Sequence, residues 1–267
     1  MGAARREPLD FVIERPLCTP AAAGSRSADT ERRTIPAVAE PLVSFNAPGS
    51  FEADQYRALR YAVERRQREA GLKVLGVSSP GPGDGKSVTL LNLAGALGQA
   101  RRSRVLVVDA DLRRPSIAQY LGLPPRHARG LADAIVEDGV DWTDAIVPLD
   151  EFNLSVLPSD AVRESPYELL SAPRFERILA EARRQFDFVL IDTPPLLPFP
   201  DCRVLTRLVD GFLLVVAAHR TPRRMVAEAL RLLDPAQIAG VVFNGEDSRR
   251  SSYGAYAYYG YHGTQGG

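Results

Sequence analysis

Three glycines alternate with other residues just before a lysine and a serine, in the segment SSPGPGDGKSVT at positions 78–89. Glycines allow backbone N–H groups to turn inward around phosphate oxygens, and the start of a helix adds a partial positive charge. Lys86 would reach the β- and γ-phosphates of a nucleotide, and the Ser87 hydroxyl would bind Mg²⁺. The spacing therefore predicts a nucleotide-binding loop made of Gly81, Pro82, Gly83, Asp84, Gly85, Lys86, Ser87 and Val88.

The sequence around this loop separates two interpretations of it. A Gly/Pro-rich segment can simply connect two elements, and Pro80 stands where the pattern G-x-x-x-x-G-K-S has its first glycine. However, an apolar run precedes the loop at 74–78, and a helical pattern begins at Ser87. Because this motif requires a strand before the loop and a helix after it, we favour nucleotide binding.

Three aspartates follow apolar runs and could work beside the loop. Asp109 and Asp111 lie in RVLVVDADLRRP, and Asp192 lies in FDFVLIDTPP. Ligands of open parallel sheets bind at the carboxyl ends of the strands, so the three carboxylates are expected to converge on the loop. A buried carboxylate is costly unless it meets a cation. Although such aspartates also cap helices, the neighbouring loop favours a Mg²⁺ site formed by Ser87, Asp109 and Asp192.

The elements that must position these residues alternate along the chain. Short apolar runs predict buried strands, and the stretches between them have a helical pattern. This alternation predicts an α/β fold with a doubly wound, mostly parallel sheet and helices on both faces. The expected strands are 74–78, 105–108, 154–157, 188–191, 212–217 and 238–243, and the clearest helices are 87–100, 174–184 and 223–233.

Composition divides the chain into three parts. Residues 1–48 are rich in Pro, Ala, Arg and Ser without a sustained period, which predicts a largely disordered arm. The folded domain is expected at 49–245, and it begins with a helix that Ser50 caps and Gly71 ends. Residues 246–267 lose aliphatic side chains and predict a flexible tail. This tail holds five of the nine tyrosines, which are Tyr253, Tyr256, Tyr258, Tyr259 and Tyr261.

Charge and cysteine content narrow the function classes. The 33 basic and 33 acidic residues balance, which argues against a dedicated nucleic-acid binder. Two cysteines are too few for a disulfide framework. The longest apolar runs are far shorter than the ~20 residues that span a bilayer. These features predict a cytoplasmic chain without a membrane segment of its own.

Together these motifs resemble the bacterial tyrosine kinases of capsule and exopolysaccharide biosynthesis, within the ParA/MinD-like class of P-loop ATPases. The matching segments are PGPGDGKS, VVDADLRRP, VLIDTPP, SPYELLSAPRF, GVVFN and YGAYAYYGYHG. The resemblance implies ATP and Mg²⁺ as cofactors, with Asn244 near the adenine. It also implies a phosphoryl transfer served by Lys86, Asp109, Asp111 and Asp192, and either Asp109 or Asp111 would face the acceptor tyrosine.

The resemblance further implies that a neighbouring copy phosphorylates the tail tyrosines and that this regulates polysaccharide polymerisation and export. The segment DQYRALR resembles the family's Glu-x-x-Arg-x-x-Arg oligomerisation motif through Asp54, Arg57 and Arg60, with Asp54 in place of glutamate. The three residues share one helical face, and a solvated charged face is an equal alternative. Arg113 is a candidate for binding phosphate or a neighbouring subunit.

A chain without a membrane segment resembles the family's stand-alone form. A separate membrane protein of the polysaccharide chain-length type activates that form, which implies recruitment to the inner face of the cytoplasmic membrane. Two other functions stay open: a ParA/MinD-like ATPase switch and an ATP-gated scaffold without kinase activity. ParA relatives usually carry a second lysine early in the loop, where this chain has Gly81, so the kinase branch is favoured. A Tyr/Gly-rich tail is also compatible with a merely adhesive low-complexity segment.

Overall fold

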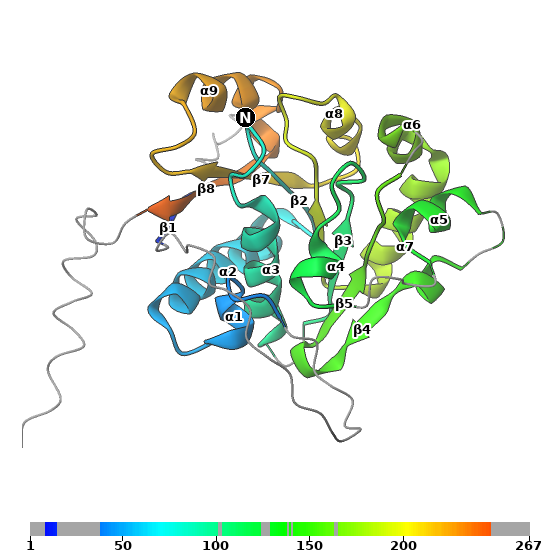
Figure 1. The fold of residues 1–267 in the computed structure, drawn as a ribbon, viewed down its shortest axis with the longest axis horizontal. Helices are drawn as coiled ribbons and strands as arrows, with labels where there is room; N and C mark the ends of the chain where they lie inside the picture. Colours follow the sequence, from blue (N-terminus) through cyan, green and yellow to red (C-terminus); the bar gives the residue numbers. More distant parts are fainter. Residues whose placement is uncertain are drawn as a thin grey trace, which may run out of the picture.

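The computed structural model describes residues 9–14, 38–100, 103–123, 129–137, 139, 141–162 and 165–246. Within them, eight strands form one sheet in the order β1-β8-β7-β2-β6-β3-β5-β4 (Figure 1). Every described pairing is parallel except that of β4 with β5. The strands are β1 (Leu9–Glu14), β2 (Val74–Ser78), β3 (Val105–Asp109), β4 (Val147–Leu149), β5 (Leu154–Leu157), β6 (Phe188–Asp192), β7 (Gly211–Ala217) and β8 (Ile238–Glu246).

Helices cover both faces of the sheet, and each face has its own hydrophobic cluster. One cluster joins α2, α3 and α4 to the sheet through residues such as Tyr56 and Leu93. The other joins α5 to α9 to the opposite face through residues such as Phe175 and Ile178. The helices are α1 (Val43–Asn46), α2 (Phe51–Ala70), α3 (Lys86–Gly98), α4 (Ile117–Tyr120), α5 (Leu131–Val136), α6 (Pro166–Ser171), α7 (Pro173–Gln185), α8 (Asp201–Leu205) and α9 (Arg223–Arg231).

The predicted doubly wound α/β fold is confirmed. All six strands and all three helices expected from the sequence are present, with ends within three residues of the predicted positions. The two ends of α2 also agree with the prediction. The Ser50 hydroxyl accepts a hydrogen bond from the Ala53 N–H at 3.1 Å, and Gly71 ends the helix with a φ of 69°. None of the described helices is long and apolar enough to cross a bilayer.

Two elements lie within residues 1–48, for which the sequence predicts a largely disordered arm, and residues 1–8 and 15–37 lie outside the described residues. Strand β1 runs parallel to β8, because the segment LDFVIE has the apolar and β-branched residues that suit a strand beside an open edge. Helix α1 is held by Asn92, whose side chain accepts from the Ser44 N–H and donates to the Pro41 carbonyl. The tail tyrosines lie outside the described residues.

The three central strands place the predicted site. Strands β2, β6 and β3 are neighbours, and Asp109 at the end of β3 lies beside Asp192 at the end of β6. The loop from Ser79 to Gly85 leaves β2 at this same edge and leads into α3. Parallel pairing therefore brings the loop and the strand-end acids together, as the sequence predicted.

Candidate active site

The loop between β2 and α3 depends on glycine at its last position. Gly85 has a φ of 92°, in the left-handed region that favours glycine. A Cβ at Gly85 would lie 2.0 Å from Nδ2 of Asn244, which approaches from the end of β8. That Nδ2 donates to the Asp84 carbonyl at 3.0 Å. The conformation of the loop and its packing against β8 therefore both require a residue without a side chain.

The side chain of Asp84 holds the loop in place. Its Oδ2 accepts from the Gly81 N–H at 3.1 Å, and its Oδ1 accepts from the Thr221 hydroxyl at 2.6 Å. Thr221 Oγ1 in turn accepts from the Ala217 N–H at 3.2 Å. Asp84 is buried, so these bonds replace the water that it gives up. The sequence predicted Asp84 in the loop but gave no signal for Thr221, which lies 137 residues away.

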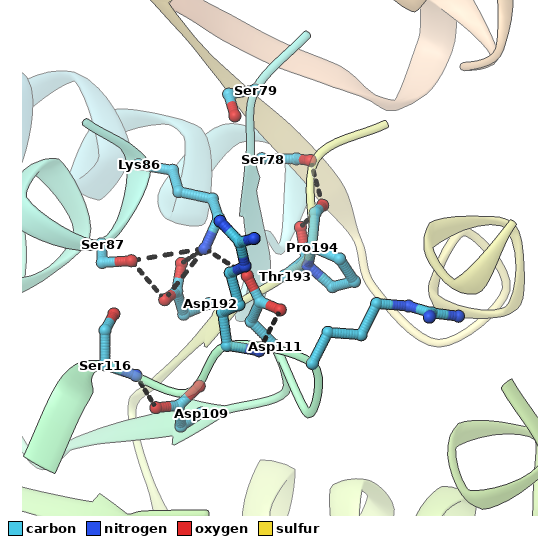
Figure 2. A network of polar contacts seen from close by, with 12 residues as sticks. Ser78, Ser79, Lys86, Ser87, Asp109, Asp111, Ser116, Asp192, Thr193 and Pro194 are labelled. Carbon is cyan, nitrogen blue, oxygen red and sulfur yellow. Dashed lines mark hydrogen bonds and ion pairs between the residues drawn. The ribbon is translucent and has the colours of Figure 1, made fainter. Parts of the chain in front are cut away.

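Lys86 and Ser87 meet two of the predicted acids at the start of α3 (Figure 2). Lys86 Nζ lies 2.8 Å from Asp111 Oδ2 and 3.3 Å from Asp192 Oδ1. The Ser87 hydroxyl donates to Asp192 Oδ2 at 2.6 Å. Burial opposes the charge of the ammonium, but the carboxylates of Asp192 and Asp111 outweigh it and raise the pKa of Lys86. Lys86 is therefore a permanent cation at the mouth of the loop.

Asp109, like Asp192, is fully buried. Its Oδ2 accepts from the N–H groups of Ser116 and Ile117, at 2.9 and 3.0 Å. Its Oδ1 is buried and is without a hydrogen-bond partner. Burial, followed by the charge of Asp192, raises the pKa of Asp109 to about 8. Burial also raises the pKa of Asp192. At both carboxyl groups, burial therefore outweighs the stabilising charge of the nearby Lys86 ammonium.

The arrangement fits a magnesium ion that also binds a nucleotide. Among the described residues, no group of three or more His, Cys, Asp and Glu side chains is placed to hold a metal by itself. Ser87 and Asp192 nevertheless supply adjacent oxygen atoms, and Asp109 adds the unpartnered Oδ1. Mg²⁺ prefers oxygen ligands and takes few of them from the protein, with waters and phosphates completing its shell. The donor set is therefore of the right kind.

A cleft of about 440 Å³ opens over these charged groups. Its floor includes Lys86, Ser87 and Asp111, whereas Asp109 does not line it. The remaining lining comes from the loop, from the segment after β3 and from the segment after β6. These residues are Pro82, Gly83, Gly85, Val88, Arg113, Arg114, Ser116, Tyr120, Pro195, Pro198 and Phe199.

Arg113 is bound within the protein. Its Nε and Nη2 donate to the two carboxylate oxygens of Asp201, at 2.6 and 3.2 Å. Its guanidinium carbon lies 4.2 Å from the centre of the Phe199 ring. Arg113 thus forms an ion pair at the start of α8 while a third of its side chain stays exposed, and its contact with phosphate or a neighbouring subunit remains a prediction. Sequence reasoning missed Asp201 and Phe199 because nothing local in the chain connects them to Arg113.

The remaining predicted site residues lie apart from the charged floor. Asn244 contacts the far side of the loop, and its Oδ1 is buried without a hydrogen-bond partner. On α2, Asp54 pairs with Arg57, and both are substantially exposed. Arg60 instead turns toward α3, where it donates to the Ala96 carbonyl at 3.0 Å. The predicted oligomerisation face therefore offers Asp54 and Arg57, with Arg60 used inside the fold.

Comparison with known proteins gives consistent results. Residues 72–218 match a family model described as an AAA domain. The chain is 31% identical over 221 residues to the tyrosine-protein kinase YwqD of Bacillus subtilis, a match that covers 82% of this chain and 91% of YwqD. It is also 31% identical over 219 residues to the succinoglycan biosynthesis transport protein ExoP of Rhizobium meliloti, which covers 80% of this chain but only 27% of ExoP.

Solved structures agree with the sequence relatives. The kinase domain of the Escherichia coli tyrosine kinase ETK is similar to this chain, with a TM-score of 0.74 and 27% identity. The match covers 85% of this chain and 87% of that domain. The similarity therefore extends over most of both chains.

Proposed function

The chain belongs to the bacterial tyrosine-protein kinases, a nucleotide-binding P-loop family, and we propose that it transfers the γ-phosphate of ATP to tail tyrosines of a neighbouring copy. The observation that carries the proposal is the cluster formed by Lys86, Ser87, Asp111 and Asp192 beneath the glycine loop. Phosphoryl transfer depends mostly on positioning and on stabilisation of charge, and this cluster supplies both.

The loop and Lys86 are proposed to bind the phosphates. Backbone N–H groups of residues 83–88, at the end of the loop and the start of α3, would surround the phosphate oxygens. Ser87 and Asp192 are proposed to hold Mg²⁺, with Asp109 supporting them from below. The ion would neutralise charge on the transferring phosphoryl group. Asn244 is proposed to recognise the adenine through its amide, of which Oδ1 has no partner within the described residues.

Asp111 is the better candidate for the acid that faces the acceptor tyrosine. It lines the cleft, whereas Asp109 does not. Its Oδ2 is paired with the Lys86 ammonium, which would be drawn toward the negatively charged phosphates. That movement would release Asp111 to accept a hydrogen bond from the tyrosine hydroxyl. A carboxylate is a much weaker base than a phenolate and does not ionise a tyrosine hydroxyl in advance, so the acceptor's proton would move late in the transfer.

The acceptors are proposed to be Tyr253, Tyr256, Tyr258, Tyr259 and Tyr261 in the tail of an adjacent copy. Asp54 and Arg57, exposed on α2, would contribute to the contact between copies. Each phosphotyrosine adds about −1.5 to −2 charges, so five of them would add roughly −8 to −10 to one tail. We expect this charge to expel the tail and to dissociate the oligomer.

The biological role is proposed from relatives. ExoP is named for succinoglycan biosynthesis transport, and this chain spans about a quarter of that protein. We therefore propose that tail phosphorylation regulates polymerisation and export of a capsule or exopolysaccharide. A separate membrane protein would activate the chain and recruit it to the inner face of the cytoplasmic membrane.

Mass spectrometry of the intact chain tests this function. The full chain incubated with ATP and Mg²⁺ is expected to gain phosphate on peptides that contain residues 253–261, and its mass by light scattering is expected to fall. Lys86→Met should gain no detectable phosphate over the same incubation time. ATP turnover by the unaltered chain without any phosphotyrosine would instead indicate an ATPase switch and would overturn the kinase assignment.

A further inference from the structure

One side of the cleft is formed by residues that belong neither to the loop nor to the strand-end acids. The segment after β6 contributes Pro195, Pro198 and Phe199 to the lining. Pro195 is buried, Phe199 is half-buried and Pro198 is exposed. An apolar wall therefore stands in the same cleft as the charged floor. Apolar contacts do not stabilise bound phosphates or metal ions, whereas they do stabilise a bound aromatic ring.

Arg113 gives this wall a flat cationic surface. Asp201 is fully buried and binds the guanidinium through two hydrogen bonds, so Arg113 is held in one orientation. Phe199 covers one face of the guanidinium. The Arg113 side chain still has 33% of its surface exposed and lines the cleft. A guanidinium held in this way stacks on aromatic rings from either face.

The position of the wall indicates that it binds the ring of the acceptor tyrosine rather than the nucleotide base. Asn244, the candidate for adenine recognition, contacts the loop at Asp84 and Gly85 and does not line this cleft. Asp111, the proposed acid for the acceptor hydroxyl, does line it and precedes Arg113 by two residues. A phenol that reached Asp111 through the cleft would have its ring beside the wall.

We infer that Phe199 and Arg113, with Pro195 and Pro198, bind the ring of the acceptor tyrosine. This inference rests on the proposed kinase function and names the residues that select its substrate. Serine and threonine have no ring to place against the wall, so their hydroxyls would gain nothing from it. The wall thereby accounts for a preference for tyrosine.

The test uses the full chain with ATP, Mg²⁺ and a synthetic peptide that copies residues 250–262. Phe199→Leu keeps an apolar side chain but removes the ring, and Phe199→Tyr keeps the ring. We expect Phe199→Leu to lower kcat/KM for the peptide about tenfold through a higher KM, because ring stacking is lost. Its KM for ATP should stay within about twofold of the unaltered value, since the wall does not touch the nucleotide. Phe199→Tyr should restore the peptide kinetics.

A matched change elsewhere gives the control. Tyr167 is exposed on α6, and Tyr167→Leu should leave both KM values unchanged. The inference is overturned if Phe199→Leu leaves the peptide KM unchanged, or if it raises the KM for ATP as much as the peptide KM. The second result would assign the wall to the nucleotide or to the fold. An unaltered chain that phosphorylates neither its tail nor the peptide would overturn the kinase function first, and this inference with it.

Discussion

Aspartates at the two ends of the central strands have opposite environments. At the carboxyl end, Asp109 and Asp192 close β3 and β6, and burial raises the pKa of both. At the amino end, Asp210 directly precedes β7 and Asp187 directly precedes β6. Burial alone would raise the pKa of these two residues as well, but arginine side chains and backbone N–H groups lower it. Aspartate thus has a raised pKa at the carboxyl end of the sheet and a lowered pKa at the amino end.

Asp210 shows what the difference means. It accepts from the N–H groups of Lys73 and Val74, and both of its oxygens bind Arg183. By contrast, Asp109 keeps a buried oxygen without a partner. The amino-end acids are therefore satisfied by the fold and stabilise it, whereas at the carboxyl end burial outweighs the compensation that Lys86 provides. Such buried acids lower the stability of the folded protein, and this cost is expected to accompany ligand binding at the site.

The largest effect is expected at Lys86. Lys73 and Lys86 are the only lysines in the chain, and they lie at opposite ends of the segment formed by β2 and its loop. Lys86→Met should lower kcat/KM for tyrosine phosphorylation by about 10²–10³, because it removes the positive charge that stabilises the transferring phosphoryl group. Lys73→Met is the control and should retain activity, since the backbone rather than the side chain of Lys73 binds Asp210. If Lys86→Met and Lys73→Met lost equal activity in a phosphopeptide assay, the distinction between the carboxyl and amino ends of β2 would be contradicted.

Gly85→Ala should be the next most severe change. The new Cβ would collide with Asn244 and would force a strained φ, so nucleotide affinity should fall about 30- to 100-fold. Calorimetric titration with ATP and Mg²⁺ measures the loss. The double variant with Asn244→Gly removes the collision but should recover little affinity, because the strain at φ remains and the proposed adenine contact is lost. Full affinity in Gly85→Ala alone would show that the loop does not need glycine.

Asp210→Ala should affect stability without affecting nucleotide affinity. Loss of its charged hydrogen bonds should lower the free energy of unfolding by about 2 kcal/mol. Its folded pKa lies below the unfolded value, so this contribution is fully present at neutral pH and is lost as pH falls through the folded pKa. Urea unfolding should therefore show the gap between variant and unaltered chain narrowing below about pH 4. A gap that widened toward acid would reverse the assigned sign.

Thr221→Val should produce the smallest effect. It leaves Asp84 Oδ1 without its hydroxyl donor, which should cost about 1 kcal/mol of stability and weaken nucleotide binding about fivefold. Thr206→Val is the control, because within the described residues that hydroxyl donates to the exposed Arg203 carbonyl nearby and not to the loop. Thermal unfolding and ATP titration of both variants check the prediction. Similar ATP affinities in the two variants would show that Asp84 does not need this support.

The sequence predicted those parts of the site that repeat a local pattern. The glycines before Lys86 and the aspartates after apolar runs are visible within a few residues, and parallel topology then brings Asp192 to the loop. The pairs Arg113–Asp201 and Asp84–Thr221 join segments 88 and 137 residues apart. No period or motif encodes such contacts. Strand β1 was missed for a related reason, because it becomes a strand only beside the edge of β8.

In the proposed mechanism, one copy phosphorylates the tail of another through the cleft at Lys86. Mixing two variants tests it most directly: Lys86→Met with its tail intact, and a chain with active Lys86 whose five tail tyrosines are phenylalanine. With ATP and Mg²⁺, mass spectrometry is expected to find phosphate on the tail of the Lys86→Met chain. If that tail stays unmodified while the unaltered chain phosphorylates itself, transfer between copies is contradicted.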